Sequence, residues 1–427
     1  MKFQNIPKEF FSGNRKALSK LMQENSIAFF FAHEELWRNG DQYYGFRQNS
    51  NFFYLTGILQ TSTVLVLRKT ENNNFLETLF VPKEDKKHEI WYGHQLTKEE
   101  ACEISAIEDV RYLEDFKPSL EAWLSLSNVV YIDRMENEGF AKKINYTGQR
   151  FFNDLSPAEQ QKYISISPLM AKLRLVKQEI ELDLIRQAIR VTQQAFVRML
   201  STFGKLNTEY EVEAEISYVF NRHGMTHAYP PIIAGGLNAT VLHYVDNNDS
   251  LMDGDLLLLD FGAENTNYAA DCSRTIPVNG KFTQRQKEIY EAVLRVQEAM
   301  IPEYIPGNTI RKLNEKSGQL MEIELQKLGL ISPEDIQSQD PENPRYKKYY
   351  MHGLAHFLGL DVHDVGNKDT PFEKGMILTC EPGIYIPEER IGIRIEDDIL
   401  VDDIPVNLMQ DIPKKRNEIE TLIQVER

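Results

Sequence analysis

The sequence predicts an α/β protein built from two domains. Its 427 residues exceed what one ordinary hydrophobic core organises, and 42% of them are hydrophobic, which is enough for a sizeable interior. Short runs rich in β-branched and aromatic residues alternate with helical patterns along the chain. The pattern changes near residue 170, where we place the boundary between domains 1–170 and 171–427.

The first domain is expected to be the smaller α/β domain. Residues 51–68, NFFYLTGILQTSTVLVLR, are typical of a strand, a turn and a second strand. TLFVPK (78–83) and NVVYIDR (128–134) predict further strands. TKEEACEISA (97–106) and LEAWLSL (120–126) predict helices between them, so strands and helices are mixed throughout this domain.

The second domain is expected to begin with a helix and to contain paired strands. Beyond Pro168, Leu182, Ile185, Ile189 and Phe196 recur at helical spacing, which predicts one long amphipathic helix packed on a core. Two further helices and two hairpin-like strand pairs are predicted at 285–301, 310–329, 255–278 and 376–401.

The composition limits the classes of partner. The formal net charge of −16 argues against nucleic acid, whose phosphates bind lysine and arginine. The apolar runs are too short to span a bilayer and MKFQNIPKEFF is not typical of a secretion signal, so we expect no membrane partner. Cys102, Cys272 and Cys380 are odd in number and far apart, which fits a reducing compartment, and the predicted location is cytoplasmic.

Two aspartates are predicted to face each other in the first strand pair. Asp260 ends an apolar run and Asp271 follows in the next strand. A turn centred on Asn265 and Thr266 would place them directly opposite, with Cβ atoms about 4.5–5.5 Å apart. Like charges so placed destabilise a hairpin unless a cation lies between them. A metal ion is one reading, and a register displaced by one residue, which sends one aspartate to the other face, is the alternative.

Two glutamates are predicted to have the same relation in the second strand pair. A turn at Glu388–Glu389 would place Glu381 opposite Glu396, although Pro382 lacks an N–H for the ladder. Glu396 also shares a strand face with Arg394, so a plain ion pair is the alternative to a metal site.

Three histidines lie in the segment YMHGLAHFLGLDVHDVG (350–366). His352 and His356 have the spacing of helical zinc ligands, but no glutamate lies between them to act as a base. Gly353 and Gly359 also weaken a helix here. A metal site, a catalytic site and a core segment all remain open for this segment alone. Together with four carboxylates, a histidine would complete a site suited to Mn, Mg, Fe(II), Co or Zn.

These motifs together resemble those of the Xaa-Pro aminopeptidases (aminopeptidase P), metal-dependent peptidases of the pita-bread superfamily. The resemblance extends over nearly the whole chain and implies a C-terminal pita-bread catalytic domain preceded by a smaller α/β N-terminal domain. It also implies a homodimer or homotetramer. The matching stretches are LLLLDFGAENTNYAADCSRTIPV, HGLAHFLGLDVHDVG, LTCEPGIYI, GIRIEDDIL, YPPIIAGGLNATVLHY, KRNEIETLI and, in the first domain, FRQNSNFFYLTG.

The resemblance implies a site for two divalent metal ions. The expected ligands are Asp260, Asp271, His356, Glu381 and Glu396, with Asp271 and Glu396 bridging the ions. Mn²⁺ is the expected metal, with Co²⁺, Zn²⁺ or Fe²⁺ as alternatives. Every ligand position holds the residue type that the family uses. That argues against the metal-free creatinases and against a non-catalytic, peptide-binding member of the fold.

The resemblance also implies the reaction. A hydroxide between the metals would attack the Xaa-Pro carbonyl and release the N-terminal residue of peptides with proline in second position (Xaa-Pro-Yaa). Glu381 would accept the proton of the attacking water. His243, His352 and His363 would face the substrate, and Arg394 would orient the carboxylates or the substrate.

The same resemblance implies roles for two aromatic residues and leaves one competing activity. Tyr229 is expected to line the pocket, and Trp91 resembles a tryptophan that in some relatives reaches the active site of a neighbouring subunit. Prolidase, which cleaves only Xaa-Pro dipeptides with the same ligands, is the alternative activity. YPPIIAGG before His243, together with the first domain, favours aminopeptidase P. Methionine aminopeptidase typically lacks such a first domain.

Overall fold

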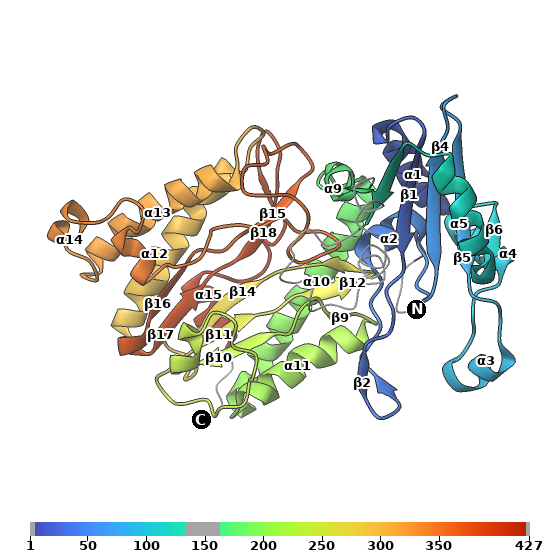
Figure 1. Ribbon diagram of the computed structural model, residues 1–427. Coiled ribbons are helices and arrows are strands. Elements are labelled where there is room, and N and C mark those ends of the chain that lie inside the picture. Colours follow the sequence, from blue (N-terminus) through green and yellow to red (C-terminus); the bar gives the residue numbers. More distant parts are fainter. Residues whose placement is uncertain (1–4, 134–162, 424–427) are drawn as a thin grey trace. The chain divides into compact units, whose positions relative to one another are not determined.

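A six-stranded mixed sheet organises the N-terminal unit, Asn5–Arg174, of the computed structural model (Figure 1). The structure describes residues 5–133 and 163–423. The strand order is β6-β5-β4-β1-β7-β8, antiparallel across β5-β4-β1 and parallel for the remaining pairs. The strands of the sheet are β1 (Ser26–Phe31), β4 (Val64–Lys69), β5 (Phe75–Val81), β6 (Val110–Tyr112), β7 (Val129–Ile132) and β8 (Tyr163–Ser165).

The sheet of this unit is held by an apolar core against its helices. Phe29, Val66 and Phe80 of the sheet pack with Trp123 in one buried cluster, and every residue of β1 is buried. The unit also contains the hairpin β2 (Trp37–Asn39) and β3 (Gln42–Tyr43) and the α-helices α1 (Lys8–Leu21), α2 (Ser50–Thr56), α3 (Lys86–Tyr92), α4 (Lys98–Ser105), α5 (Phe116–Ser125) and α9 (Ser167–Arg174).

One predicted strand of this unit is a helix. Residues 51–56 lie in α2, where the Asn49 side chain accepts a hydrogen bond from the Phe52 N–H and caps the first turn. Gly57, in the left-handed conformation with φ 71°, ends the helix. These two end signals outweigh the strand preference of the aromatic residues between them. The other strands and helices predicted in this unit are present.

The second unit, Leu175–Arg427, places its strands between two pairs of helices (Figure 1). The helix pair α10 and α11 precedes the first hairpin in the chain, and the pair α12 and α13 follows it. The helices are α10 (Glu179–Thr202), α11 (Glu209–Arg222), α12 (Gln284–Met300), α13 (Ile310–Lys327), α14 (Pro333–Gln337) and α15 (Arg416–Leu422). The predicted α/β class, with a smaller domain before the larger one, is therefore confirmed.

Short antiparallel ladders make up the sheets of this second unit. β10-β11-β14, β13-β12-β9 and β15-β18-β19 form three-stranded sheets, and β16-β17 is a two-stranded one. The strands are β9 (Thr226–His227), β10 (Ile232–Gly235), β11 (Leu256–Asp260), β12 (Ala263–Asn265), β13 (Tyr268–Ala269), β14 (Ser273–Pro277), β15 (Ile377–Cys380), β16 (Gly383–Ile386), β17 (Ile391–Arg394), β18 (Asp397–Leu400) and β19 (Val406–Asn407).

The single long helix predicted near the boundary is two helices. α9 ends at Arg174, and α10 begins after Gln178, which forms a capping box with Glu181. In the short connection, Lys177 makes a buried ion pair with Asp364, with 2.9 Å between Nζ and Oδ2 and only 1% of either side chain exposed. The connection is therefore fixed to the segment that carries the three neighbouring histidines.

The first hairpin does not have the predicted register. Ser273, and not Asp271, lies opposite Asp260 in the β11–β14 ladder. The turn centres on Thr266 and Asn267, one residue later than expected, with φ of 51° and 66°. Such a pair of positive φ angles is typical of a tight hairpin turn. The predicted direct facing is wrong, but the partner moves by two positions, so both aspartates stay on one face.

The second hairpin has the predicted register. Gly383 pairs with Arg394 in β16–β17, and Cys380 pairs with Asp397 in β15–β18. The same register on both sides places Glu381 across from Glu396, where the ladder is interrupted at Pro382 as its missing N–H requires.

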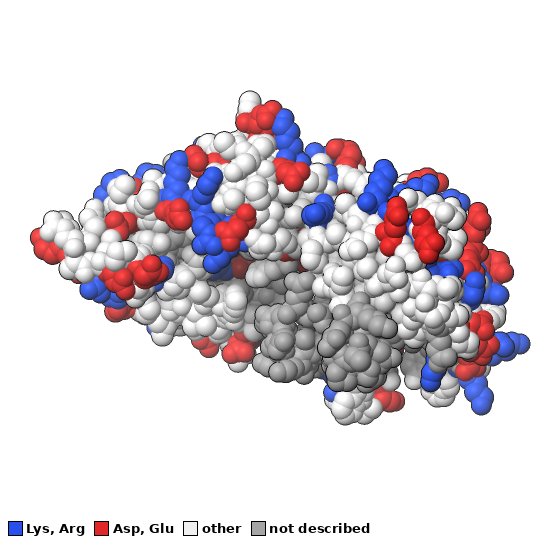
Figure 2. Space-filling model, turned by 45° about the horizontal axis from the view of Figure 1, so that its top comes forward, with Lys and Arg blue, Asp and Glu red and all other residues white. Residues whose placement is uncertain are grey.

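The described residues on the face shown in Figure 2 mix acidic and basic side chains, so this face has no large patch of one sign. Among the helices of the described residues, none combines the length and the apolar character needed to cross a membrane. A group of side chains that could hold a metal ion lies inside the second unit and consists of Asp271, His356 and Glu396.

Candidate metal centre

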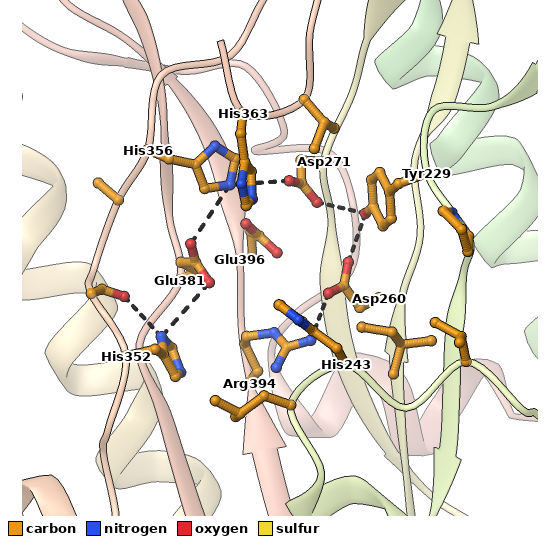
Figure 3. Close-up of a pocket in the computed structure, with 17 residues that line it drawn as sticks. Tyr229, His243, Asp260, Asp271, His352, His356, His363, Glu381, Arg394 and Glu396 are labelled. Atoms are coloured by element: carbon orange, nitrogen blue, oxygen red, sulfur yellow. Dashed lines mark hydrogen bonds and ion pairs between the residues drawn. The ribbon is translucent and has the colours of Figure 1, made fainter. Parts of the chain in front are cut away.

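One pocket of the second unit gathers all the predicted ligands and catalytic residues of that unit (Figure 3). The carboxylates and the arginine come from the two hairpins, and the histidines come from loops. The predicted residues that line the pocket are Tyr229, His243, Asp260, Asp271, His352, His356, His363, Glu381, Arg394 and Glu396. Residues from Tyr229 to Glu396 in the chain therefore meet at one place.

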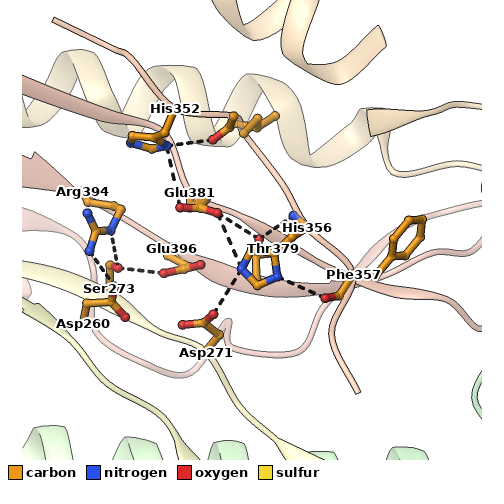
Figure 4. A network of polar contacts seen from close by, with 12 residues as sticks. Asp260, Asp271, Ser273, His352, His356, Phe357, Thr379, Glu381, Arg394 and Glu396 are labelled. Carbon is orange, nitrogen blue, oxygen red and sulfur yellow. Dashed lines mark hydrogen bonds and ion pairs between the residues drawn. The ribbon is translucent and has the colours of Figure 1, made fainter. Parts of the chain in front are cut away.

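His356 lies among the carboxylates. Its Nε2 atom is 3.3 Å from Asp271 Oδ2 and 3.7 Å from Glu381 Oε1 (Figure 4). Its Nδ1 atom is 3.1 Å from the Phe357 carbonyl oxygen, so Nδ1–H donates there and Nε2 faces the acids. Donor atoms of Asp271, His356 and Glu396 all lie within 4.8 Å of one another. The segment around His356 is not helical, as its two glycines predicted.

Tyr229 links the two aspartates of the first hairpin. Its hydroxyl oxygen is 2.6 Å from Asp260 Oδ1 and 2.5 Å from Asp271 Oδ1. One hydroxyl hydrogen can serve only one of these acceptors at a time. Burial and the adjacent carboxylates raise the pKa of Tyr229 well above its usual value. Tyr229 was predicted only to line the pocket, and the structure shows that it also holds two of the acids.

A buried arginine connects the two hairpins behind the carboxylates. Arg394 donates from Nη2 to Asp260 Oδ2 (2.6 Å), from Nε to Ser273 Oγ (2.8 Å) and from Nη1 to the Tyr385 hydroxyl (2.9 Å). Ser273 Oγ in turn donates to Glu396 Oε2 at 2.7 Å (Figure 4). The plain ion pair between Arg394 and Glu396 is therefore replaced by a pair with Asp260 and a link through Ser273.

His352, His243 and His363 differ in whether their ring nitrogens make hydrogen bonds within the protein. Nδ1 of His352 is 2.8 Å from the following carbonyl oxygen, and Nε2 is 2.9 Å from the Tyr385 hydroxyl. Both ring nitrogens are thus occupied, and burial, with a nearby arginine, lowers the pKa of His352 to about 4. His243 and His363 are exposed to the pocket, and neither makes a hydrogen bond to another described residue. These two imidazoles are the ones available to a ligand.

The electrostatics of the pocket favour a cation. Burial is the largest cause that raises the pKa of Glu381 to about 7 and that of Glu396 well above its usual value, and the neighbouring carboxylates add to it. Burial alone would lower the pKa of His356, but its bond to Asp271 and the charge of Glu381 outweigh burial and raise it to about 9. Without a metal ion the cluster therefore retains protons that a divalent cation would displace.

The sequence matches known families at both ends of the chain. Residues 183–403 match "Metallopeptidase family M24", and residues 11–131 match "Aminopeptidase P, N-terminal domain". The chain belongs to the aminopeptidase P family of M24 metallopeptidases. This confirms the predicted family and its pita-bread fold behind an N-terminal α/β domain.

Relatives of this family match over nearly their full length. The Xaa-Pro aminopeptidase of Haemophilus influenzae is 36% identical over 432 residues, covering 98% of each chain. That of Escherichia coli is 37% identical over 440 residues, again covering 98% of each chain. The structure of E. coli aminopeptidase P with the inhibitor Pro-Leu has a TM-score of 0.88 at 35% identity and covers 98% of this chain and 99% of that one.

Two residues that support this aminopeptidase P site were missed by the sequence reasoning. Ser273 follows Asp271 by two positions, and Tyr385 follows Gly383, the strand partner of Arg394, by two positions. Strand alternation alone would have placed each beside a predicted site residue. Trp91, by contrast, lies on α3 of the N-terminal unit with 80% of its surface exposed.

The residues present fit the metal that an M24 peptidase implies. Asp271, His356 and Glu396 offer one imidazole and two carboxylates from three separate segments at a spacing that suits a single ion. Carboxylate-rich sets with one imidazole suit hard or borderline divalent cations rather than copper(I) or an iron–sulfur cluster.

We expect Mn²⁺ affinity to fall as the pH falls through about 7. The pKa of Glu381 is raised to about 7 and that of Glu396 is raised well above its usual value, so at lower pH the ion must displace protons from these carboxylates. Titration calorimetry in two buffers of different ionisation enthalpy would measure both affinity and proton release. An affinity that stays constant between about pH 5.5 and pH 8, with no proton release, would contradict this expectation.

Proposed function

We propose that this protein is a metal-dependent Xaa-Pro aminopeptidase, which removes the N-terminal residue from peptides with proline in second position. The observation that carries this proposal is the meeting of four carboxylates, His356 and two unengaged histidines in one pocket. Family membership over nearly the full chain, with relatives named Xaa-Pro aminopeptidases, supports the same function.

Five side chains would hold two divalent ions in this proposal. These side chains would be Asp260, Asp271, His356, Glu381 and Glu396, which all line the pocket. Mn²⁺ is our first choice, and the structure of Zn-substituted E. coli aminopeptidase P supports zinc as an alternative. When bound, such ions supply a water ionised near neutral pH and polarise the substrate carbonyl.

Glu381 is suited to move protons in this reaction. Glu381 lines the pocket, with its Oε1 atom 3.7 Å from His356 Nε2, and a carboxylate positioned beside the reacting atoms can act as a general base. Thr379 Oγ1 lies 3.4 Å from Glu381 Oε1 and orients it from the side of β15. We propose that Glu381 accepts a proton from the attacking water and passes it to the prolyl nitrogen, which needs one to leave.

The histidines divide between two roles in this proposal. His243 and His363 face the pocket with free ring nitrogens and would donate to the substrate carbonyl as charge develops on it. His352 has both nitrogens engaged, so we assign it a positioning role through Tyr385 and Arg394. Arg394 orients Asp260 directly.

The peptide chemistry can be tested with two substrates. Purified protein with Mn²⁺ should release the first residue from an Xaa-Pro-Yaa tripeptide, measured by chromatography of the products. Cleavage of an Xaa-Pro dipeptide alone would favour prolidase. Folded, Mn²⁺-loaded protein that cleaves neither would overturn both readings and leave the non-catalytic, peptide-binding alternative.

The two proposed kinds of histidine can be separated by metal analysis. His356→Ala should lose bound Mn²⁺, because it removes a ligand, whereas His363→Ala should keep its metal. We expect His363→Ala to lower kcat by about 10²-fold, as for removal of one oxyanion donor. Elemental analysis after gel filtration measures the metal. Equal metal loss in both variants would show that the roles are assigned wrongly.

We further propose a cytoplasmic homodimer or homotetramer. The three cysteines are free, which fits a reducing compartment and supports the cytoplasmic location.

An exposed apolar group on α3 supports the oligomer. Ile90 and Trp91 are each 80% exposed and Tyr92 is 63% exposed, a contiguous group of the kind that a second subunit covers. Light scattering should show an oligomer for the wild-type protein and a smaller species for Trp91→Ala. A monomeric wild-type protein would exclude the proposal.

A further inference from the structure

Glu209, at the start of α11, is a fully buried carboxylate that does not line the pocket. Its two oxygens accept four hydrogen bonds. Oε1 accepts from the Gly235 N–H (2.7 Å) and from Asn238 Nδ2 (3.1 Å). Oε2 accepts from the Tyr244 hydroxyl (2.7 Å) and from the Asp249 N–H (2.9 Å). One side chain therefore satisfies donors spread over fifteen residues of another segment.

All four donors belong to the segment 235–249, which we name the His243 loop. It carries His243 and also Leu242 and Val245, which line the pocket. Two donors precede His243 in the chain and two follow it, and one of them, Tyr244, is its immediate neighbour. Because the His243 ring makes no hydrogen bond to another described residue, its place in the pocket depends on the backbone that carries it.

An ordinary role at a helix start does not account for Glu209. An acidic residue in the first turn stabilises a helix from the surface, as Glu211 does in the same turn through a capping box. Glu209 is instead turned inward, with none of its surface exposed. Burying a carboxylate is costly unless hydrogen bonds compensate it, and here charge-assisted bonds to the His243 loop provide that compensation.

A second contact fixes the far end of the same loop. Asn247, 3% exposed, accepts from the Ile233 N–H (2.9 Å) and donates to the Pro231 carbonyl oxygen (2.9 Å) and to Glu213 (2.9 Å). Glu213 lies one turn of α11 beyond Glu209. The helix therefore holds the His243 loop at two successive turns.

We propose that Glu209 is a positioning residue for peptide cleavage, which sets the place of His243 in the pocket by fixing the loop on both sides of it. The inference rests on the proposed function and on the substrate-facing role of His243. Glu209 touches neither the substrate pocket nor the proposed metal ligands, so it acts on the reaction only through the loop.

Glu209→Gln is the direct test. The amide keeps the size of the side chain but turns an N–H₂ group toward donors, so the bonds on one side are lost. With Mn²⁺ bound, we expect kcat/KM for a Xaa-Pro-Yaa tripeptide to fall by about 10- to 100-fold, as for a misplaced catalytic group. The loss should divide between kcat and KM as it does in His243→Ala, with bound metal unchanged. Glu211→Gln, in the same helical turn, is the matched control and should retain wild-type kinetics.

A double-mutant cycle separates positioning from general loss of structure. In a His243→Ala background, Glu209→Gln should cost less than about twofold further, because coupled residues are not additive. Losses that multiply, or a Glu209→Gln enzyme with wild-type kinetics, would overturn the inference. If Glu209→Gln does not fold, Tyr244→Phe removes one of the four bonds and the same cycle is run with it. Wild-type protein that cleaves no Xaa-Pro-Yaa peptide would instead overturn the proposed function.

Discussion

Repulsion between buried carboxylates is the constraint on which the catalytic unit depends. Asp260, Asp271, Glu381 and Glu396 share one pocket with few permanent positive charges nearby. Arg394 pairs with Asp260, and His356 reaches Asp271 and Glu381. Two cationic partners for four acids leave an excess of negative charge, which burial makes more costly. A bound cation stabilises such an arrangement by neutralising the excess negative charge.

The fold meets this constraint by bringing the acids in on two hairpins, each of which contributes two carboxylates. Asp260 ends β11, whereas the other three acids lie in the short breaks between paired strands, so the flanking strand pairs fix their places. The surrounding hydrogen bonds then set the individual oxygens, with Tyr229 between the aspartates and Ser273 between Arg394 and Glu396. Loops supply the histidines, and for His243 we infer that the buried Glu209, outside the pocket, fixes the loop that carries it.

Strand register could be predicted in part from the sequence, because side chains alternate along a strand. The pairing of Glu381 with Glu396 followed from the turn at Glu388–Glu389. The turn before Asp271 was placed one residue too early, since the choice between two adjacent turn positions depends on backbone angles that Thr266 and Asn267 adopt only rarely. The error was harmless for the site, because a partner displaced by two residues stays on the same face.

The helix α2 had a local signal that the strand prediction missed, because Asn49 and Gly57 mark its ends while the aromatic residues between them favour strands. Other features had no local signal. Glu209 looks like any acid at a helix start, and its four partners lie 26 to 40 residues further along the chain. The engagement of His352 by Tyr385 likewise depends on tertiary contacts. Residue types at a site can thus be recognised from motifs, whereas the groups that hold them in place require the structure.

The buried pair of Lys177 and Asp364 changes how one glycine of the HGLAHFLGLDVHDVG stretch is understood. A Cβ atom at Gly359 would lie 2.2 Å from Asp364 Oδ2 and 2.9 Å from Lys177 Nζ. The missing side chain makes room for an ion pair and not for the peptide being cut. A glycine inside a sequence motif of the catalytic site can therefore be required by packing next to the site and not by contact with the substrate. Replacing Gly359 would first disturb the ion pair that holds the α9–α10 connection to the histidine-bearing loop. Any effect on peptide cleavage would follow from that disturbance.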